Sequence, residues 1–169
     1  MTQYVKSPRT QIKLVQGKVE SKVTPLSQNK GRFEVSSPLA IAGVRGTHFR
    51  VGVNENGVAN EVLEGGVAVG NKDKPQALVL PAGQGNIVSK AGVGKAIALL
   101  PAPILVDAYQ VQERPTLQFS VQATNQAVSY HAQISKDAES QNLVAEAHDK
   151  NLHFKFEGLD DGNYFIRVT

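Results

Sequence analysis

Cysteine and tryptophan are absent from this chain of 169 residues, and aromatic residues make up only 6% of it. The lack of cysteine excludes disulfide frameworks, thiolate metal sites and cysteine nucleophiles. No apolar run approaches the roughly 20 residues that a membrane-spanning helix needs. Residues 1–6 also lack the basic and then apolar pattern of a signal peptide. We therefore expect no membrane span in this chain, and we expect the chain to be a part of a longer protein.

Patterns that carry catalysis or bind cofactors are equally scarce. The chain has four histidines, which are His48, His131, His148 and His153. None of them has further metal ligands at the spacing of a zinc site, and no Ser, His and Asp set has nucleophile-elbow spacing. Residues 92–95 end in Gly94-Lys95, but alanine follows where a phosphate loop needs Ser or Thr. The sequence predicts no enzyme activity, no metal site and no cofactor.

Short strand-forming runs dominate the chain instead. Fifteen glycines and eight prolines punctuate runs rich in valine and isoleucine, and several of these runs alternate apolar and polar residues with a period of two. Such alternation is typical of strands with one buried face, and the turns between them are rich in Asn, Asp and Gly. The pattern predicts an all-β fold.

Pro101 and Pro103 mark the clearest boundary, because two prolines within three residues end a strand. Residues 1–102 hold 13 Lys and Arg and 6 Asp and Glu, which is +7, whereas residues 103–169 hold 5 and 9, which is −4. The sum is the +3 of the whole chain. We predict one domain over residues 1–101 and a second over residues 104–169.

The second domain alternates like a strand sandwich and ends in the pattern L-x-x-G-x-Y-x-x-R-V. This ending, which contains Gly162 and Tyr164, resembles the tyrosine corner of fibronectin type III and Ig-like modules, where the tyrosine hydroxyl bonds back to the preceding loop. About 66 residues are too few for seven strands, which take roughly 100. The sequence predicts an incomplete fibronectin-type or Ig-like β-sandwich whose last strand is missing.

The most specific stretch of the first domain is V-R-G-T-H-F-R-V at residues 44–51. Gly46 interrupts strand-forming residues, as glycine does at a bulge or at a close approach of two backbones. Val44 and Phe49 differ in parity, so both can face the core only if the alternation shifts between them. We expect a bulge near Gly46 and Thr47 to produce that shift.

Three spaced blocks follow one another in the order of a known family. V-R-G-T-x-F-x-V is followed by V-L-E-G-x-V-x-V at residues 62–69 and by A-G-x-G at residues 82–85. This order resembles the FecR-like domain of bacterial envelope proteins over roughly residues 11–100, with Ser37-Pro38 where the family usually has Thr-Pro. The residues that carry the motif, in a structural or a recognition role, are Val44, Arg45, Gly46, Thr47, Phe49, Leu63, Glu64, Gly65, Gly83 and Gly85.

The resemblance implies a β-solenoid-like or flattened sandwich body in the periplasm or cell envelope. The order of a FecR-like domain, a Pro-rich link and a fibronectin-like module is similar above all to a group in which a peptidoglycan-binding LysM module precedes the FecR-like domain. This similarity implies a non-catalytic binding, scaffolding or signal-sensing module. The alternative is the periplasmic sensor part of an iron-siderophore anti-sigma system. A second alternative, an envelope glycan-active enzyme, lacks a cluster of acidic and aromatic residues in residues 1–102.

The expected partners are an envelope protein or peptidoglycan or another anionic glycan. The positive residues of the first domain are scattered singly, with few aromatics for base stacking, so the sequence predicts no nucleic-acid binding. For Arg45 two roles remain open. Its guanidinium could bond to backbone carbonyls of a neighbouring turn, or it could form an exposed pair with Arg50 that meets an acidic partner.

Overall fold

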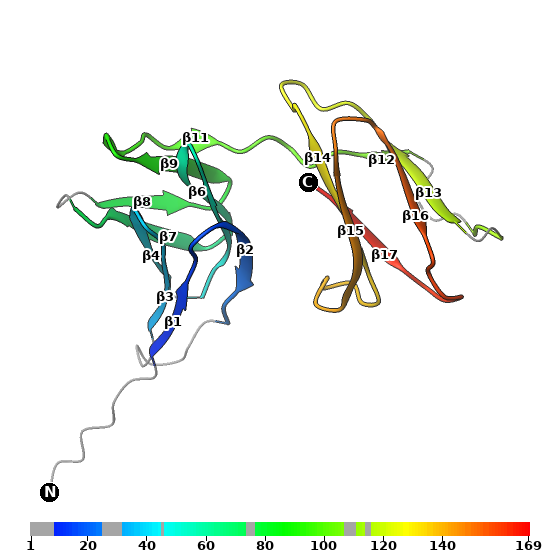
Figure 1. The fold of residues 1–169 in the computed structure, drawn as a ribbon, viewed down its shortest axis with the longest axis horizontal. Coiled ribbons are helices and arrows are strands. Elements are labelled where there is room, and N and C mark those ends of the chain that lie inside the picture. The colour runs from blue at the N-terminus through cyan, green and yellow to red at the C-terminus, as the bar shows by residue number, and fades with distance from the viewer. Residues whose placement is uncertain (1–8, 25–31, 45, 74–76, 107–110, 114–115) are drawn as a thin grey trace, which may run out of the picture. The chain divides into compact units, whose positions relative to one another are not determined.

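The computed structural model describes residues 9–24, 32–44, 46–73, 77–106, 111–113 and 116–169, in which strands are joined by turns (Figure 1). No helix occurs in these ranges, and so none of them forms a helix that could cross a membrane. The all-β fold class is confirmed. Arg45 lies outside the described residues.

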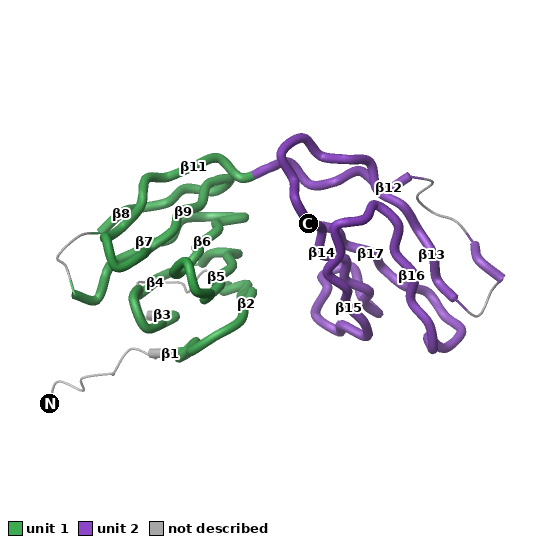
Figure 2. The backbone as a smooth tube through the Cα atoms, turned by 45° about the horizontal axis from the view of Figure 1, so that its top comes forward, with its two compact units in different colours: residues 1–99 green, residues 100–169 purple. Residues whose placement is uncertain are grey.

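The chain divides into two compact units, residues 1–99 and residues 100–169 (Figure 2). The division falls just before the two prolines at which the sequence predicts a boundary. Each unit has its own cluster of buried apolar side chains, and the two clusters share no residue. Each unit is therefore described by itself.

Two sheets build unit 1, here called sheets A and B. Sheet A has the strand order β1-β3-β4-β7-β8, in which β1 and β3 are parallel and the other neighbours are antiparallel. Its strands are β1 (Arg9–Lys13), β3 (Arg32–Ser36), β4 (Ala40–Val44), β7 (Gly66–Asn71) and β8 (Ala77–Pro81).

Sheet B is antiparallel and has the order β10-β9-β6-β5-β2, with β11 also paired to β9. Its strands are β2 (Gly17–Lys22), β5 (His48–Asn54), β6 (Gly57–Glu64), β9 (Gln84–Ser89), β10 (Gly92–Val93) and β11 (Ile97–Ala98). The facing sides of sheets A and B share one core, so unit 1 is a sandwich.

Period-two alternation decides which side chains enter that core. In β4 the burial alternates strictly, with Ala40, Ala42 and Val44 inside. Phe49 on β5 is 1% exposed and meets the ring of Phe33 edge to face at a centroid distance of 6.1 Å. Full burial of each such apolar side chain stabilises the fold by about 1.5–3 kcal/mol. The same alternation places charged side chains of β2, β5 and β6 on the outer face of sheet B.

Unit 2 is a smaller sandwich. Sheet C has the order β12-β13-β16, sheet D has the order β15-β14-β17, and all pairs are antiparallel. The strands are β12 (Leu105–Val106), β13 (Thr116–Val121), β14 (Tyr130–Ser135), β15 (Leu143–Asp149), β16 (His153–Glu157) and β17 (Phe165–Val168). Its core contains Phe154 and Phe156, both stacked on Phe119.

Candidate functional site

The three motif blocks of unit 1 meet at one corner of its sandwich. The chain passes from sheet A to sheet B after Val44, returns to sheet A at Gly65, and crosses again at Gly83. The hydroxyl of Thr47 donates a hydrogen bond to the carbonyl oxygen of Gly66 at 3.0 Å. The N–H of Ala82 donates to the carbonyl of Gly65 at 3.0 Å. Residues 19 and 17 positions apart in sequence are thus joined by one hydroxyl bond and one backbone bond.

Glycine is required at this corner because two backbones touch. Gly65 has a φ of 78°, and a Cβ there would lie 2.7 Å from the carbonyl oxygen of Gly46. Real Cβ atoms essentially never approach an atom this closely. Gly46 itself has a φ of 67°, a conformation that an L side chain rarely adopts. The motif glycines therefore let two crossings of the chain pack against one another.

Val44 and Phe49 both face the core, but for a different reason from the one expected. They lie in different sheets, Val44 on β4 of sheet A and Phe49 on β5 of sheet B, so both can face the core without a shift of the alternation within one strand. In the ladder between β5 and β6, His48 pairs with Glu64 and Phe49 pairs with Val62. The register therefore shifts by one residue, and the extra residue is Leu63 on β6. The expected bulge at Gly46 and Thr47 is thus corrected to a bulge on the neighbouring strand.

The remaining motif positions surround the same corner. Glu64 lies opposite His48 in the ladder between β5 and β6. Gly83 has a φ of 78° and donates its N–H to the carbonyl of Val62 at 2.8 Å. A Cβ at Gly85 would lie 2.7 Å from the carbonyl oxygen of Asn60. These contacts are structural, and the role of Arg45 stays a prediction because that residue lies outside the described ranges.

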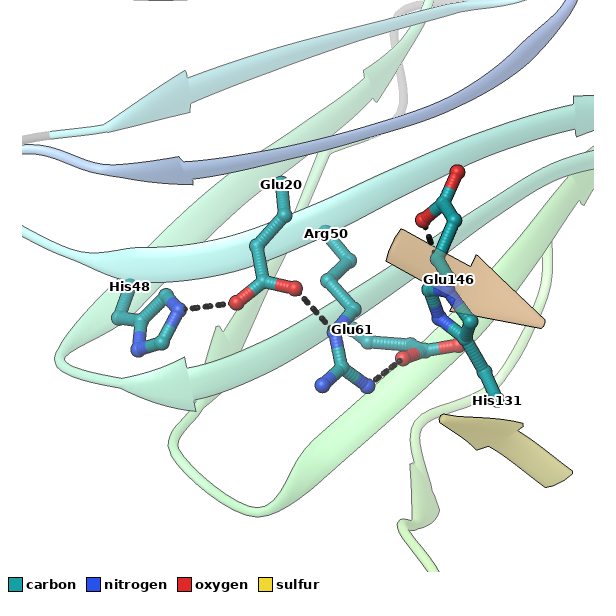
Figure 3. Close-up of polar contacts among 6 residues, drawn as sticks. All are labelled: Glu20, His48, Arg50, Glu61, His131 and Glu146. Atoms are coloured by element: carbon teal, nitrogen blue, oxygen red, sulfur yellow. Dashed lines mark hydrogen bonds and ion pairs between the residues drawn. The ribbon is translucent and has the colours of Figure 1, made fainter. Parts of the chain in front are cut away.

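A charged network lies on the outer face of sheet B beside this corner (Figure 3). The Arg50 guanidinium bonds Glu20 through Nε at 3.0 Å and Glu61 through Nη1 at 3.3 Å. The second oxygen of Glu20 lies 2.6 Å from Nε2 of His48. The four side chains come from three neighbouring strands and are between 17% and 33% exposed.

Pairing across strands explains this network. Glu20 lies directly opposite Arg50, and Arg50 lies directly opposite Glu61, so the three charges form one row across β2, β5 and β6. Opposite charges at such positions contribute about 0.2–1 kcal/mol each. Alternation along β5 is enough to place His48 and Arg50 on the same face. It does not identify Glu20 and Glu61 as their partners, because those partners depend on the register between β2, β5 and β6. Arg50 pairs with the carboxylates of Glu20 and Glu61, and both roles considered for Arg45 stay predictions, because Arg45 lies outside the described residues.

In unit 2 the hydroxyl of Tyr164 donates a hydrogen bond to the carbonyl oxygen of Asp160 at 2.6 Å. It also accepts one from Lys136 Nζ at 2.9 Å, and that ammonium lies 4.0 Å from the centre of the ring. Gly162, two residues earlier, lies exposed in the turn before β17. The tyrosine-corner prediction requires a bond of this kind from the hydroxyl to the preceding backbone, and the assignment to a fibronectin-type module stays a prediction.

Unit 2 also brings together two histidines that the sequence analysis treated as separate. His131 on β14 lies directly opposite His148 on β15, and their rings stack at a centroid distance of 3.9 Å. Among the described residues, no group of three or more His, Asp or Glu side chains is arranged to hold a metal ion. The sequence does not predict this pair, because the register between the two strands depends on the length of the turn that joins them.

Comparison with known proteins supports the motif-based assignment of unit 1. Residues 2–68 match the family model described as FecR protein. The FecR resemblance predicted from the motif is confirmed over this range, whereas the LysM-associated grouping and the fibronectin-type module stay predictions. The third motif block, residues 82–85, lies beyond the matched range.

Two crystal structures of a candidate anti-sigma factor from Parabacteroides distasonis are similar in part. One, at 1.65 Å resolution, has a TM-score of 0.41 and 20% identity, over 52% of this chain and 40% of that chain. The other, at 2.50 Å, has a TM-score of 0.40 and 20% identity, over 50% and 40%. This chain therefore spans less than half of the length of those proteins. The comparison with curated proteins gave no significant match.

Proposed function

We propose that this chain is the periplasmic sensing part of a FecR-type regulatory system and that it acts by binding a protein partner. The observation that carries this proposal is the FecR family match over residues 2–68, which falls within unit 1. The family resemblance implies that the partner is the periplasmic part of an outer-membrane siderophore transporter. The charged outer face of sheet B is the surface that we assign to this contact.

The chemistry of that face supports a polar contact. Arg50 sits between two carboxylates, and its guanidinium is held on one side by Glu20 and on the other by Glu61. A guanidinium fixed in this way presents donors in a defined direction, and complementary charges on a partner would set orientation and association rate. Binding through such a face weakens as salt rises, because exposed charges are screened beyond about 8–10 Å at physiological salt.

The test measures binding of the intact chain to the purified periplasmic domain of an outer-membrane siderophore transporter from the same bacterium. Titration at low and high salt should show weaker binding at high salt. Arg50→Gln should weaken binding by about thirtyfold, which corresponds to the roughly 2 kcal/mol of an interface hot spot. Lys90→Gln, the same loss of charge at an exposed residue outside the network, should leave binding unchanged. Binding that Arg50→Gln leaves intact would remove this face from the proposal.

A second candidate function, envelope scaffolding of the LysM-associated kind, is favoured by unit 2. The bond from Tyr164 to Asp160 and the two three-stranded sheets support a fibronectin-like module, and such modules commonly space other domains. Sedimentation of the intact chain with purified peptidoglycan sacculi tests this function. Binding to sacculi without binding to any transporter domain would replace the sensor proposal with the scaffold. Turnover of peptidoglycan that a single carboxylate substitution abolishes would overturn both.

A further inference from the structure

The two histidines of sheet D form a pair whose geometry follows from strand pairing. Both the N–H and the C=O of His131 bond to Thr169, at 2.7 and 3.0 Å, on the side away from β15. His131 and His148 are therefore a non-hydrogen-bonded pair of the antiparallel ladder between β14 and β15. In such pairs the two Cα atoms are closest, about 4.5 Å apart, and the side chains leave the sheet side by side.

The rings of this pair are nearly parallel. The angle between their planes is 10° at a centroid distance of 3.9 Å. One ring is held in place, because Nε2 of His131 lies 2.9 Å from a carboxylate oxygen of Glu146 (Figure 3). Glu146 lies two residues before His148 on the same face of β15. No hydrogen bond to the ring of His148 is found among the described residues, so that ring can turn toward a ligand.

We propose that His131 and His148 form a two-imidazole chelate for a divalent transition-metal ion of the copper, nickel and zinc group. Neutral imidazole nitrogen is a preferred ligand of these ions. Two imidazoles on facing strands offer two nitrogen donors close together, and water or a further ligand fills the other positions. Glu146 is a positioning residue, since a carboxylate bonded to one ring nitrogen orients the ring and raises the basicity of the other.

The charge of this half of the chain favours a cation. Residues 103–169 carry 9 acidic and 5 basic side chains, and such an excess attracts cations. Two charged side chains lie on the outer face of sheet D one ladder step from the pair. Glu146 on β15 and Arg167 on β17 both lie opposite Gln133 of β14. This proposal concerns unit 2 and does not depend on the proposed function of unit 1.

The other two described histidines provide matched controls. His48 is held in the network with Glu20. His153 lies singly on β16, where its Nδ1 is 2.7 Å from the hydroxyl of Ser120. Each of them is one imidazole with an oxygen partner, without a second ring beside it. A surface that binds metal through any exposed histidine would bind at these residues as well.

The experiment titrates the intact chain, without an affinity tag, with Cu²⁺, Ni²⁺ and Zn²⁺ by calorimetry at neutral pH. We expect one site per chain. His131→Asn and His148→Asn should each weaken binding by about tenfold or more, whereas His48→Asn and His153→Asn should leave it unchanged. Glu146→Gln should weaken binding by about tenfold, the lower end of the effect of an outer-shell partner.

Electron paramagnetic resonance of the Cu²⁺ complex provides a readout that does not depend on the folding of any variant. Hyperfine structure from two nitrogens in the wild-type chain is the expected result. Hyperfine structure from one nitrogen, equal losses in the His48 and His153 variants, or no metal binding by the folded wild-type chain would each overturn the proposal.

Discussion

The hydroxyl of Thr47 donates a hydrogen bond to the carbonyl oxygen of Gly66 at 3.0 Å, and through it two motif blocks of unit 1 hold one another in place. Thr47 is 2% exposed. Its backbone is also fixed, because its N–H and C=O both bond to Val23, at 3.0 and 2.9 Å. A side chain buried at a point where the chain changes sheets thus connects β7 to the corner before β5. This relationship gives the threonine of the R-G-T motif a structural role.

Thr47→Val should destabilise unit 1 by about 0.5–1.5 kcal/mol, the net value of one hydrogen bond. Valine keeps the shape of threonine but removes the hydroxyl that donates to the carbonyl of Gly66. Chemical denaturation monitored by circular dichroism measures the change. Thr47→Ser keeps the hydroxyl and is the control. Equal losses in the two variants would mean that packing of the methyl group, and not the hydrogen bond, is what matters.

Gly65→Ala and Gly83→Ala separate backbone strain from steric overlap. Both glycines have a φ of 78°, but a Cβ at Gly83 meets nothing within 4 Å, whereas one at Gly65 meets the carbonyl of Gly46. Gly83→Ala should lower the free energy of unfolding by about 1–2 kcal/mol, the cost of the left-handed conformation. Gly65→Ala should cost about 1–3 kcal/mol more, through overpacking. Thermal denaturation of the two variants side by side measures the difference, and similar losses would contradict the close approach.

Tyr164→Phe should destabilise unit 2 by about 0.5–1.5 kcal/mol, the net value of one hydrogen bond. The variant removes only the hydroxyl that donates to Asp160. Lys136→Met is the control, since it removes the ammonium over the ring but leaves the bond from Tyr164 to Asp160. Denaturation of the intact chain, followed by signals from unit 2, measures both. A neutral Tyr164→Phe would argue against a tyrosine corner.

Asp137 should make the turn between β14 and β15 sensitive to acid. The backbone N–H groups of Gln141 and Asn142 donate to its carboxylate at 3.0 and 2.6 Å, and these bonds lower the pKa of Asp137 from its ordinary value of 3.8. A lowered pKa in the folded state means that the stabilisation is complete above pH 3.8 and is lost as the pH falls through the folded value. Nuclear magnetic resonance titration of the Asp137 carboxyl should show a midpoint below 3.8.

The acid effect at this turn should disappear in Asp137→Asn. The amide oxygen can still accept one hydrogen bond but does not titrate, so the amide protons of Gln141 and Asn142 should no longer shift together at acidic pH. A midpoint for Asp137 at or above 3.8 in the wild-type chain would contradict the proposed role of the backbone donors.

Residues 1–99 should fold without the rest of the chain. The apolar cores of the two units share no residue, and a sandwich with its own core unfolds cooperatively. The fragment should therefore show a single cooperative thermal transition by calorimetry, and limited proteolysis of the intact chain should cut near Pro101. A fragment without a transition would mean that the two units stabilise one another.

Several features of this protein were determined by the sequence alone. Period-two alternation and the absence of helical patterns predict strands, and the all-β fold class is confirmed because side-chain alternation is a local property of a strand. The motif blocks predict a resemblance to FecR-type domains, which the family match over residues 2–68 confirms for the first block and for the second as far as residue 68.

Only the tertiary structure decided how strands are paired and which side chains therefore meet. Val44 and Phe49 share a core because they lie in different sheets, which no parity argument along one strand could show. The row of Glu20, Arg50 and Glu61 and the stack of His131 on His148 depend on register between strands that are up to 30 residues apart. A shift of one residue would turn each side chain to the opposite face, and that register is fixed by burial of the whole core and not by any local pattern.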